Sequence, residues 1–96
     1  MSDITPPCWA DFSDKEGRTY TVVFGSNHFE LKLECAEKLG GSARSGGAFR
    51  LDFRGPFEPL LPQGIYRITA GKFEKEVFLV PVGRDDQSSS YEAIFN

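Results

Sequence analysis

Hydrophobic and polar residues alternate with a period of two along most of this chain. The clearest stretch is 28–35, in which every odd position is apolar and every even position is polar. A second clean alternation covers 49–54, and less regular ones cover 19–24, 65–69 and 91–95. Alternation over runs of this length is typical of half-buried strands.

A further segment, 77–80, is apolar on both faces, which predicts a strand covered on both sides. With it the chain has six candidate strands, and residues typical of turns lie between them. We therefore predict an all-β fold, a small six-stranded antiparallel barrel or strongly curved sheet. Pro81 is predicted to end the fifth strand, and 83–90 to form a polar surface loop.

The two cleanest strands also predict a register. In an antiparallel pairing whose residue numbers sum to 84, every outward pair has opposite charges: Glu30 with Arg54, Lys32 with Asp52 and Glu34 with Arg50. Inside, the same register places Leu31 opposite Phe53, Leu33 opposite Leu51 and Cys35 opposite Phe49. Opposite charges and apolar pairs across strands are both stabilising. A slip by two positions sets Glu34 against Asp52, so we favour the register that sums to 84.

The connections differ in composition. Residues 37–47 contain four glycines in the stretch 40–47, which predicts a flexible hairpin tip. A phosphate-binding loop is the alternative, but the spacing of a P-loop is absent. Residues 55–64 carry three prolines, so they form an ordered loop rather than a central strand. A tight turn at 70–72 brings Arg67 close to one of two acidic residues across the turn, Glu74 or Glu76.

The first eighteen residues lack the alternation. Thr5 followed by Pro6 is typical of a helix start, so we predict a short helix over 6–12 that carries Trp9 and Phe12 on its inner side. Such a short helix is stable only when docked, and we expect it to lie over an open end of the β core. The domain organisation is thus a single domain, 1–96, with a helix and turn in 1–18 and the antiparallel core in 19–96.

Composition limits the class of protein. The chain has 96 residues, 40% of them hydrophobic, which suits one globular domain. The net charge of −3 disfavours nucleic-acid binding, since phosphate neutralisation needs a basic surface. The first residues resemble no secretory signal, and no apolar run is long enough to span a membrane, so we expect a cytoplasmic protein. Cys8 and Cys35 are expected to be reduced, with Cys35 in the core; a disulfide between them is the alternative.

Candidate chemistry is sparse. His28 is the only histidine, which argues against a metal site built from several histidines. Cys35 lies seven positions from it, and this odd spacing on one strand predicts opposite faces and no Cys–His pair. Asp85 and Asp86 could offer carboxylates to calcium, but a solvated turn fits better. We therefore predict no catalytic residues, no cofactor, no metal and no enzymatic activity.

Four segments in order resemble one protein family. They are Arg54–Pro56, Leu61–Arg67, Phe78–Gly83 and Tyr91–Asn96. The similarity is strong over about half of the chain and continues more loosely upstream through Phe12 and Gly17. The family is an uncharacterised bacterial domain of unknown function, so the resemblance transfers no catalytic residue. It does imply a context, because members are often encoded beside phage tail-collar-like proteins. The implied role is an accessory or interaction function in a phage-derived or surface-fibre assembly.

These observations lead to two functional expectations. The first is a non-enzymatic interaction module with a protein partner, whose candidate surface includes Arg44, Phe57 and Leu60; Phe57 and Leu60, with Leu61, are also expected to cap the core. No nucleic acid and no membrane is expected as a partner, whereas self-association through an open strand edge is compatible with the pattern. The alternative is a small apolar-ligand-binding β domain with a pocket lined by three aromatic residues, Trp9, Phe12 and Tyr66.

Overall fold

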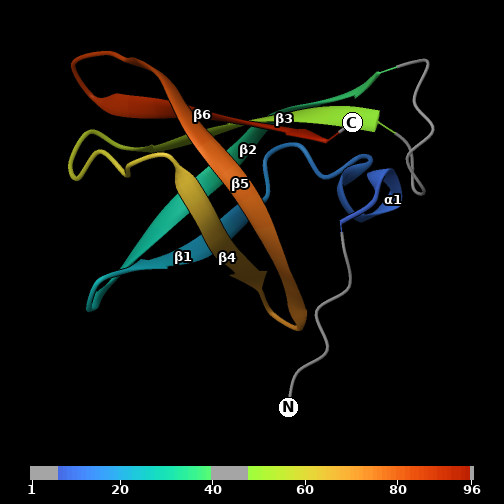
Figure 1. The fold of residues 1–96 in the computed structure, drawn as a ribbon, viewed down its shortest axis with the longest axis horizontal. Coiled ribbons are helices and arrows are strands. Elements are labelled where there is room, and N and C mark those ends of the chain that lie inside the picture. Colours follow the sequence, from blue (N-terminus) through green and yellow to red (C-terminus); the bar gives the residue numbers. More distant parts are fainter. Residues whose placement is uncertain (1–6, 40–47, 96) are drawn as a thin grey trace.

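The fold is a closed antiparallel β-barrel with one short helix (Figure 1). The computed structural model describes residues 7–39 and 48–95. In chain order the elements are α1 (Trp9–Phe12), β1 (Thr19–Phe24), β2 (Asn27–Leu39), β3 (Ala48–Pro56), β4 (Gly64–Ala70), β5 (Phe73–Arg84) and β6 (Ser88–Phe95). The predicted all-β class and six-stranded antiparallel barrel are confirmed.

The strands follow the order β1-β2-β3-β6-β5-β4 around the barrel. The first three form a meander, and β6 lies between β3 and β5 because the chain crosses from β3 to β4 before it returns. This is a Greek-key arrangement. The barrel closes through the β1–β4 ladder, which contains only the pairs Thr21–Thr69 and Val22–Ile68. The seam between β1 and β4 is therefore short.

Inward-pointing side chains fill the barrel. Its fully buried residues come from all six strands, from α1 and from the loop before β4, and the largest are Tyr20, Tyr91, Phe12, Phe49, Phe53, Leu31, Leu33, Leu51, Leu61, Ile68, Leu79 and Val22. Six strands enclose an interior of the size that side chains can fill, so the aromatic residues here are core residues. Burial of this apolar surface is the main stabilising term for the domain.

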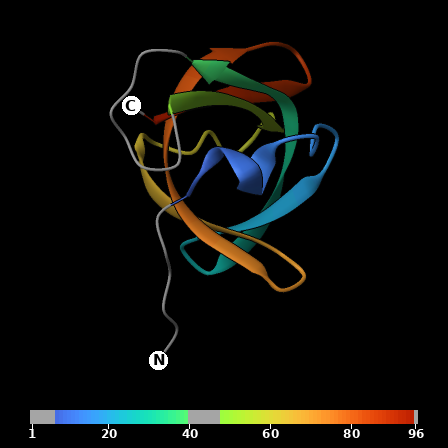
Figure 2. The ribbon, with the colours of Figure 1, turned by 90° about the vertical axis from the view of Figure 1, so that its right-hand side faces the viewer.

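Helix α1 lies across one end of the barrel, as predicted (Figure 2). Its N-cap is Cys8, whose backbone N–H donates to Asp11 Oδ2 at 2.9 Å. Phe12 is fully buried against core rings, and Trp9 packs on Phe49 with 6.0 Å between ring centroids. The predicted N-cap, Thr5, lies outside the described residues, and the helix occupies only the end of the predicted range.

The predicted register of β2 and β3 is wrong. Leu33, and not Leu31, lies opposite Phe53, and beyond a β-bulge Cys35 lies opposite Asp52. The ladder is displaced by two positions before the bulge and by three after it. The bulge resolves the charge conflict that had argued against this displacement, because Glu34 no longer faces Asp52 and instead reaches Arg54 Nε at 3.0 Å.

The same bulge overturns two further predictions. An extra residue inverts the alternation, so Cys35 is exposed instead of buried in the core. His28 is exposed as well, which means that the two side chains do not point to opposite faces. They are still seven residues apart on one extended strand, roughly 23 Å at the usual rise per residue. Cys8 and Cys35 are both free thiols.

Strands β5 and β6 are longer than predicted. Pro81 does not end β5, because a second bulge between Pro81 and Gly83 lets the strand continue to Arg84. The predicted loop over 83–90 is reduced to three residues, and Ser88 and Ser89 are buried in β6. These polar side chains can be buried because their hydroxyls are hydrogen-bonded: Ser88 Oγ accepts from Arg54 Nη1, and Ser89 Oγ donates to the Phe57 carbonyl oxygen.

The proline-containing loop is tied to the barrel by two tyrosines. Leu61 is buried, and its backbone N–H donates to Tyr91 Oη at 2.9 Å, whereas Tyr66 Oη donates to the carbonyl oxygen of Pro62. The prediction that this loop caps the core is correct only for Leu61, because Phe57 and Leu60 are 38% and 42% exposed. Tyr66 points inward, as expected.

Replacing Tyr91 with Phe tests the tie between loop and barrel. The substitution removes the only side-chain oxygen that accepts from the buried Leu61 N–H in the described contacts, so we expect a loss of about 1–2 kcal/mol in the free energy of unfolding. Urea unfolding followed by circular dichroism measures it. An unchanged midpoint would show that the loop is held by apolar packing alone.

Candidate interaction surface

A group of apolar side chains points away from the barrel on β1, β4 and β5. Ile65 is 70% exposed and lies directly opposite Phe78, which is 46% exposed. Val23 near the end of β1 is 54% exposed, and the neighbouring Phe24 ring packs on Tyr66, which places the end of β1 beside the start of β4. We call Val23, Ile65 and Phe78 the apolar face. The prediction that 77–80 is covered on both sides is therefore wrong within this chain.

Strand alternation explains why these residues face outward. Tyr66 and Ile68 fill the barrel, so the alternate positions Ile65 and Arg67 must point to solvent. In the same way, Val77 and Leu79 are buried and Phe78 is not. This signal was present in the sequence, because an inward Tyr66 requires an outward Ile65. The alternation of 65–69 by itself does not show which of its two faces is outward.

Charged residues border the apolar face. Arg67 lies 3.2 Å from Glu74 and 3.8 Å from Glu76, which confirms the contact predicted across the β4–β5 turn. Both ion pairs are half exposed to solvent and contribute little to stability. Their position beside Ile65 and Phe78 resembles the polar rim around the apolar centre of a protein interface.

The predicted surface residues Phe57 and Leu60 lie on the proline-containing loop. The Arg84 guanidinium lies over the Phe57 ring at 3.9 Å from its centroid, and Arg84 Nε donates to the Phe57 carbonyl oxygen at 3.1 Å. Ser89 Oγ donates to the same oxygen at 3.2 Å. These contacts fix Phe57 in place while leaving part of its ring exposed. Arg44, the third predicted surface residue, lies outside the described residues.

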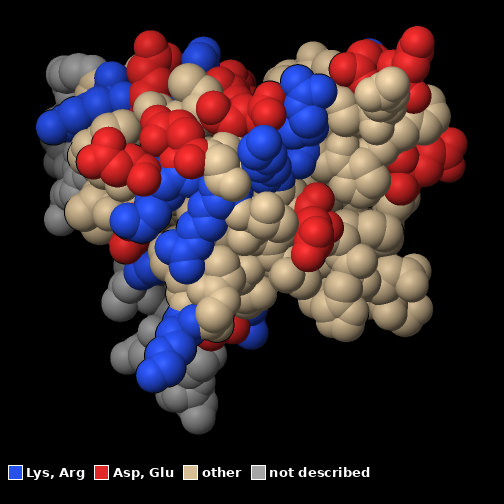
Figure 3. All heavy atoms as spheres, turned by 180° about the vertical axis from the view of Figure 1, so that it is seen from behind, with Lys and Arg blue, Asp and Glu red and all other residues tan. Residues whose placement is uncertain are grey.

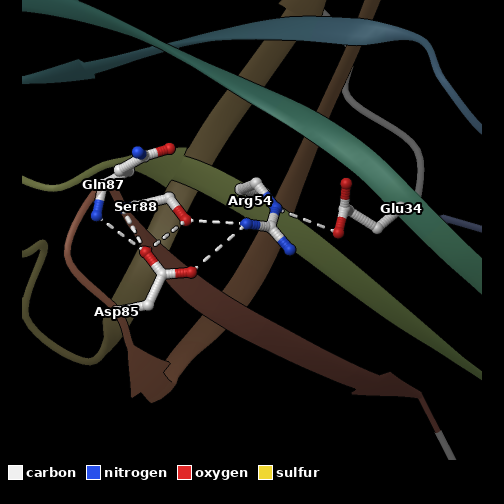
Figure 4. Close-up of polar contacts among 5 residues, drawn as sticks. All are labelled: Glu34, Arg54, Asp85, Gln87 and Ser88. Atoms are coloured by element: carbon white, nitrogen blue, oxygen red, sulfur yellow. Dashed lines mark hydrogen bonds and ion pairs between the residues drawn. The ribbon is translucent and has the colours of Figure 1, made fainter.

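A polar cluster joins β2, β3 and the β5–β6 turn (Figure 4). Arg54 contacts Glu34 on one side, and on the other its Nη1 donates to Ser88 Oγ at 2.8 Å and lies 3.6 Å from Asp85 Oδ2. Asp85 Oδ1 accepts from the backbone N–H groups of Gln87 and Ser88, both at 2.8 Å. The cluster closes a turn and holds two strands together, which is a structural role.

The same hydrogen bonds set the charge of Asp85. Donation from the Gln87 and then the Ser88 backbone lowers the pKa of the Asp85 carboxyl. Burial opposes this shift less strongly than either backbone donor, and the Ser88 hydroxyl and Arg54 add smaller effects that lower the pKa further. A lowered pKa in the folded state stabilises the fold above the unfolded-state pKa of about 3.9, and this stabilisation is lost as the pH falls through the folded-state value.

An Asp85→Asn variant should therefore be less stable than the wild type at pH 7. The difference should shrink as the pH is lowered below about 4, because the wild type then loses its charge as well. Urea unfolding at a series of pH values measures this, with Asp86→Asn, the neighbouring exposed carboxylate, as the matched control. Equal pH profiles for the two variants would contradict the role of Asp85.

The opposite side of the barrel is highly charged. Acidic and basic side chains intermix over β2 and β3 (Figure 3). Arg50 is central to this face, with Glu37 and Asp52 each at 3.3 Å and Glu92 at 3.9 Å. Asp52 raises the pKa of Arg50 most strongly, burial opposes the shift, and the two glutamates add to it. Both signs are interspersed here, unlike the uniformly basic surface that binds nucleic acid.

Metal-ligating side chains are not clustered in the part of the chain that the structure describes. Residues 7–39 and 48–95 contain no cluster of three or more His, Cys, Asp or Glu side chains arranged to hold a metal ion. An open depression of about 320 Å³ is lined by Asp85, Asp86 and Gln87. Within the same residues, no helix has the length and apolar character needed to cross a membrane.

The three aromatic residues predicted to line a ligand pocket are not brought together as one group. Trp9 and Phe12 both pack on Phe49, at the end covered by α1. Tyr66 packs on Phe24 and donates to Pro62 instead. A pocket at the α1 end would therefore be lined by other residues, chiefly Tyr20 and Phe73, whose rings contact Phe12.

Comparison with known proteins tests the expectation that the chain belongs to a family of unknown function. No curated protein and no solved structure matches the chain. One family model matches residues 7–95, which include every described helix and strand. The chain therefore belongs to the family described as Domain of unknown function (DUF6916).

Proposed function

We propose that this domain is a non-enzymatic interaction module that binds a protein partner through its apolar face. The observation that carries the proposal is the exposed cross-strand pair of Ile65 and Phe78. Single exposed apolar residues are normal on protein surfaces, but a contiguous group that contains an aromatic residue is typical of interaction sites. Val23 extends the group across the β1–β4 seam.

The surroundings of the apolar face support this function. The barrel core is complete without Ile65 and Phe78, so their large apolar side chains contribute little to the fold. Arg67, Glu74 and Glu76 provide charges of both signs at the border, which can select a partner and exclude water from the apolar centre. Phe57 and Leu60 form a second exposed apolar group at the proline-containing loop.

The partner is proposed to belong to the assembly in which the domain acts. The resemblance of four sequence segments to a family encoded beside phage tail-collar-like proteins supports a phage-derived or surface-fibre assembly. An accessory domain there needs a stable fold and a binding surface but no active site. The apolar face meets this requirement, since the rest of the barrel supplies rigidity.

Affinity capture with matched variants tests the proposal. The wild-type domain and an Ile65→Lys/Phe78→Glu double variant are used as baits in extracts of the source cells, and captured proteins are quantified by mass spectrometry. The double variant places opposite charges across the strands, so the ladder itself is preserved. Ile94→Glu is the control: Ile94 is also exposed, and its cross-strand partner is Arg50.

We expect a defined protein that the wild type and the Ile94→Glu control recover and that the double variant recovers at least about tenfold less. Recovery of the same proteins by all three baits would contradict the proposal. A Leu60→Lys bait tests the second apolar group separately. Light scattering of the purified wild type shows whether the partner is a second copy of this chain.

A further inference from the structure

Helix α1 presents an aromatic ring and a carboxylate to the barrel end. The Phe12 ring lies between Tyr20, Phe49 and Phe73, at centroid distances of 5.6–6.2 Å. One residue earlier, Asp11 Oδ2 lies 3.8 Å from Lys75 Nζ on β5. The Lys75 side chain is only 14% exposed, so its ammonium group is held close to the barrel rim.

The attachment of α1 depends on side chains. Backbone hydrogen bonds of the helical turn remain within the segment, from Asp11 to Cys8 and from Ser13 to Trp9. None of the β-ladders among the described residues includes α1. The helix can therefore leave the barrel end without breaking a strand pairing, and its departure costs the contacts of Phe12, Trp9 and Asp11.

One polar group beneath α1 has no partner. Tyr20 is fully buried, and its hydroxyl makes no hydrogen bond within residues 7–39 and 48–95. Burial raises the pKa of this hydroxyl, Arg18 acts against the shift and Asp11 adds to it, which places the group within electrostatic reach of both. A buried unsatisfied hydroxyl is costly and calls for an explanation in a native fold.

We propose that the barrel end under α1 is a masked binding site for a small aromatic carboxylate. In this site the ligand ring replaces Phe12 among Tyr20, Phe49 and Phe73. The ligand carboxylate takes the place of Asp11 beside Lys75 and accepts the hydrogen bond that the Tyr20 hydroxyl does not make to α1. The ligand thus repeats the two contacts of the helix and adds a third.

Two features favour this class of ligand over a neutral apolar one. The Arg18 guanidinium lies 5.7 Å from the ring centroids of both Tyr20 and Phe73, and its Nη2 donates to the Ala70 carbonyl oxygen, so a second cation is fixed at the same rim. A carboxylate can also accept from a hydroxyl, whereas a hydrocarbon leaves it unsatisfied. Because α1 competes for the site, the apparent affinity for the ligand equals the affinity of the open site multiplied by the fraction of molecules in which the site is open.

Titration of the wild-type domain with 3-phenylpropionate tests the proposal. Trp9 is the only tryptophan and lies on α1 against Phe49, so its fluorescence reports displacement of the helix. We expect a saturable change with 3-phenylpropionate and a much weaker response with its neutral analogue 3-phenylpropanol. Absence of a saturable change in the wild type would overturn the proposal.

Tyr20→Phe is the decisive variant. It removes only the unsatisfied hydroxyl, so the fold should be as stable as the wild type or more stable, while 3-phenylpropionate should bind at least about tenfold more weakly. Tyr66→Phe, which removes a tyrosine hydroxyl away from α1, is the matched control and should leave binding unchanged. Equal affinities of Tyr20→Phe and the wild type would overturn the proposal. Phe12→Leu, which weakens the competing helix, should bind more tightly.

Discussion

Replacing Phe12 with alanine is expected to lower the free energy of unfolding by about 3–5 kcal/mol. Phe12 is fully buried, and its ring contacts the rings of Tyr20, Phe49 and Phe73 from three different strands. The substitution removes this packing and leaves a cavity that the rigid barrel cannot fill by collapse. A domain of this kind has a total stability of about 5–15 kcal/mol, so the loss is a large part of it.

Urea unfolding followed by circular dichroism measures this effect, with Phe57→Ala as the matched control. The Phe57 ring is partly exposed and lies under Arg84, so its removal should cost about 1 kcal/mol or less. Similar losses in the two variants would show that α1 is not part of the cooperative core. That result would make the helix a peripheral segment and would leave the barrel end to be closed by strand residues alone.

The fold class could be predicted because the period of two is a direct consequence of strand geometry. The register of β2 and β3 could not be predicted in the same way, because the pairing of charges across two strands identifies a register only when the ladder has no bulge. The displacement by two was disfavoured by Glu34 facing Asp52, yet a bulge removes that contact at the cost of one unpaired residue. No local sequence signal marked the bulge, and it decided the exposure of Cys35.

The β5–β6 region was misjudged for a related reason. Polar residues such as Ser88 and Ser89 suggest a loop, but both are buried in a strand because their hydroxyls are hydrogen-bonded. Pro81 was expected to end a strand, yet it lies beside a bulge, a position where proline is tolerated. In both cases the tertiary environment, and not the residue type, determined the outcome.

The exposed apolar side chains were predicted at the proline-containing loop only. Phe57 and Leu60 are exposed, as a surface role requires, but the larger apolar face on β4 and β5 was not anticipated. An apolar run such as 77–80 indicates a strand whose two faces are both suited to burial. It does not indicate whether the second face is buried by the same chain or by another molecule. Here Phe78 is exposed, which is why the run now supports an interaction with another molecule.

Gly55 on β3 leaves room for buried side chains of β2 and β6. A Cβ at this position would lie 2.6 Å from Leu31 Cδ2 and 3.3 Å from Tyr91 Cε2, both in fully buried side chains. Gly55→Val should therefore lower the free energy of unfolding by about 3 kcal/mol through overpacking. Gly83 is also in a strand, but an added Cβ there meets no atom within 4 Å, so Gly83→Val should change stability by less than about 0.5 kcal/mol.

A double variant separates a local collision from general intolerance at Gly55. Shortening the neighbour by Leu31→Val removes the atom nearest to the new side chain, at a cost of about 1 kcal/mol on its own. If collision with Leu31 is the cause, Gly55→Val/Leu31→Val should lose less stability than the two single variants combined. Additive losses would mean that the collision with Leu31 is not the cause, which leaves the contact with Tyr91 Cε2 at 3.3 Å. Packing between Gly55 and β6, and not between Gly55 and β2, would then exclude a side chain at this position.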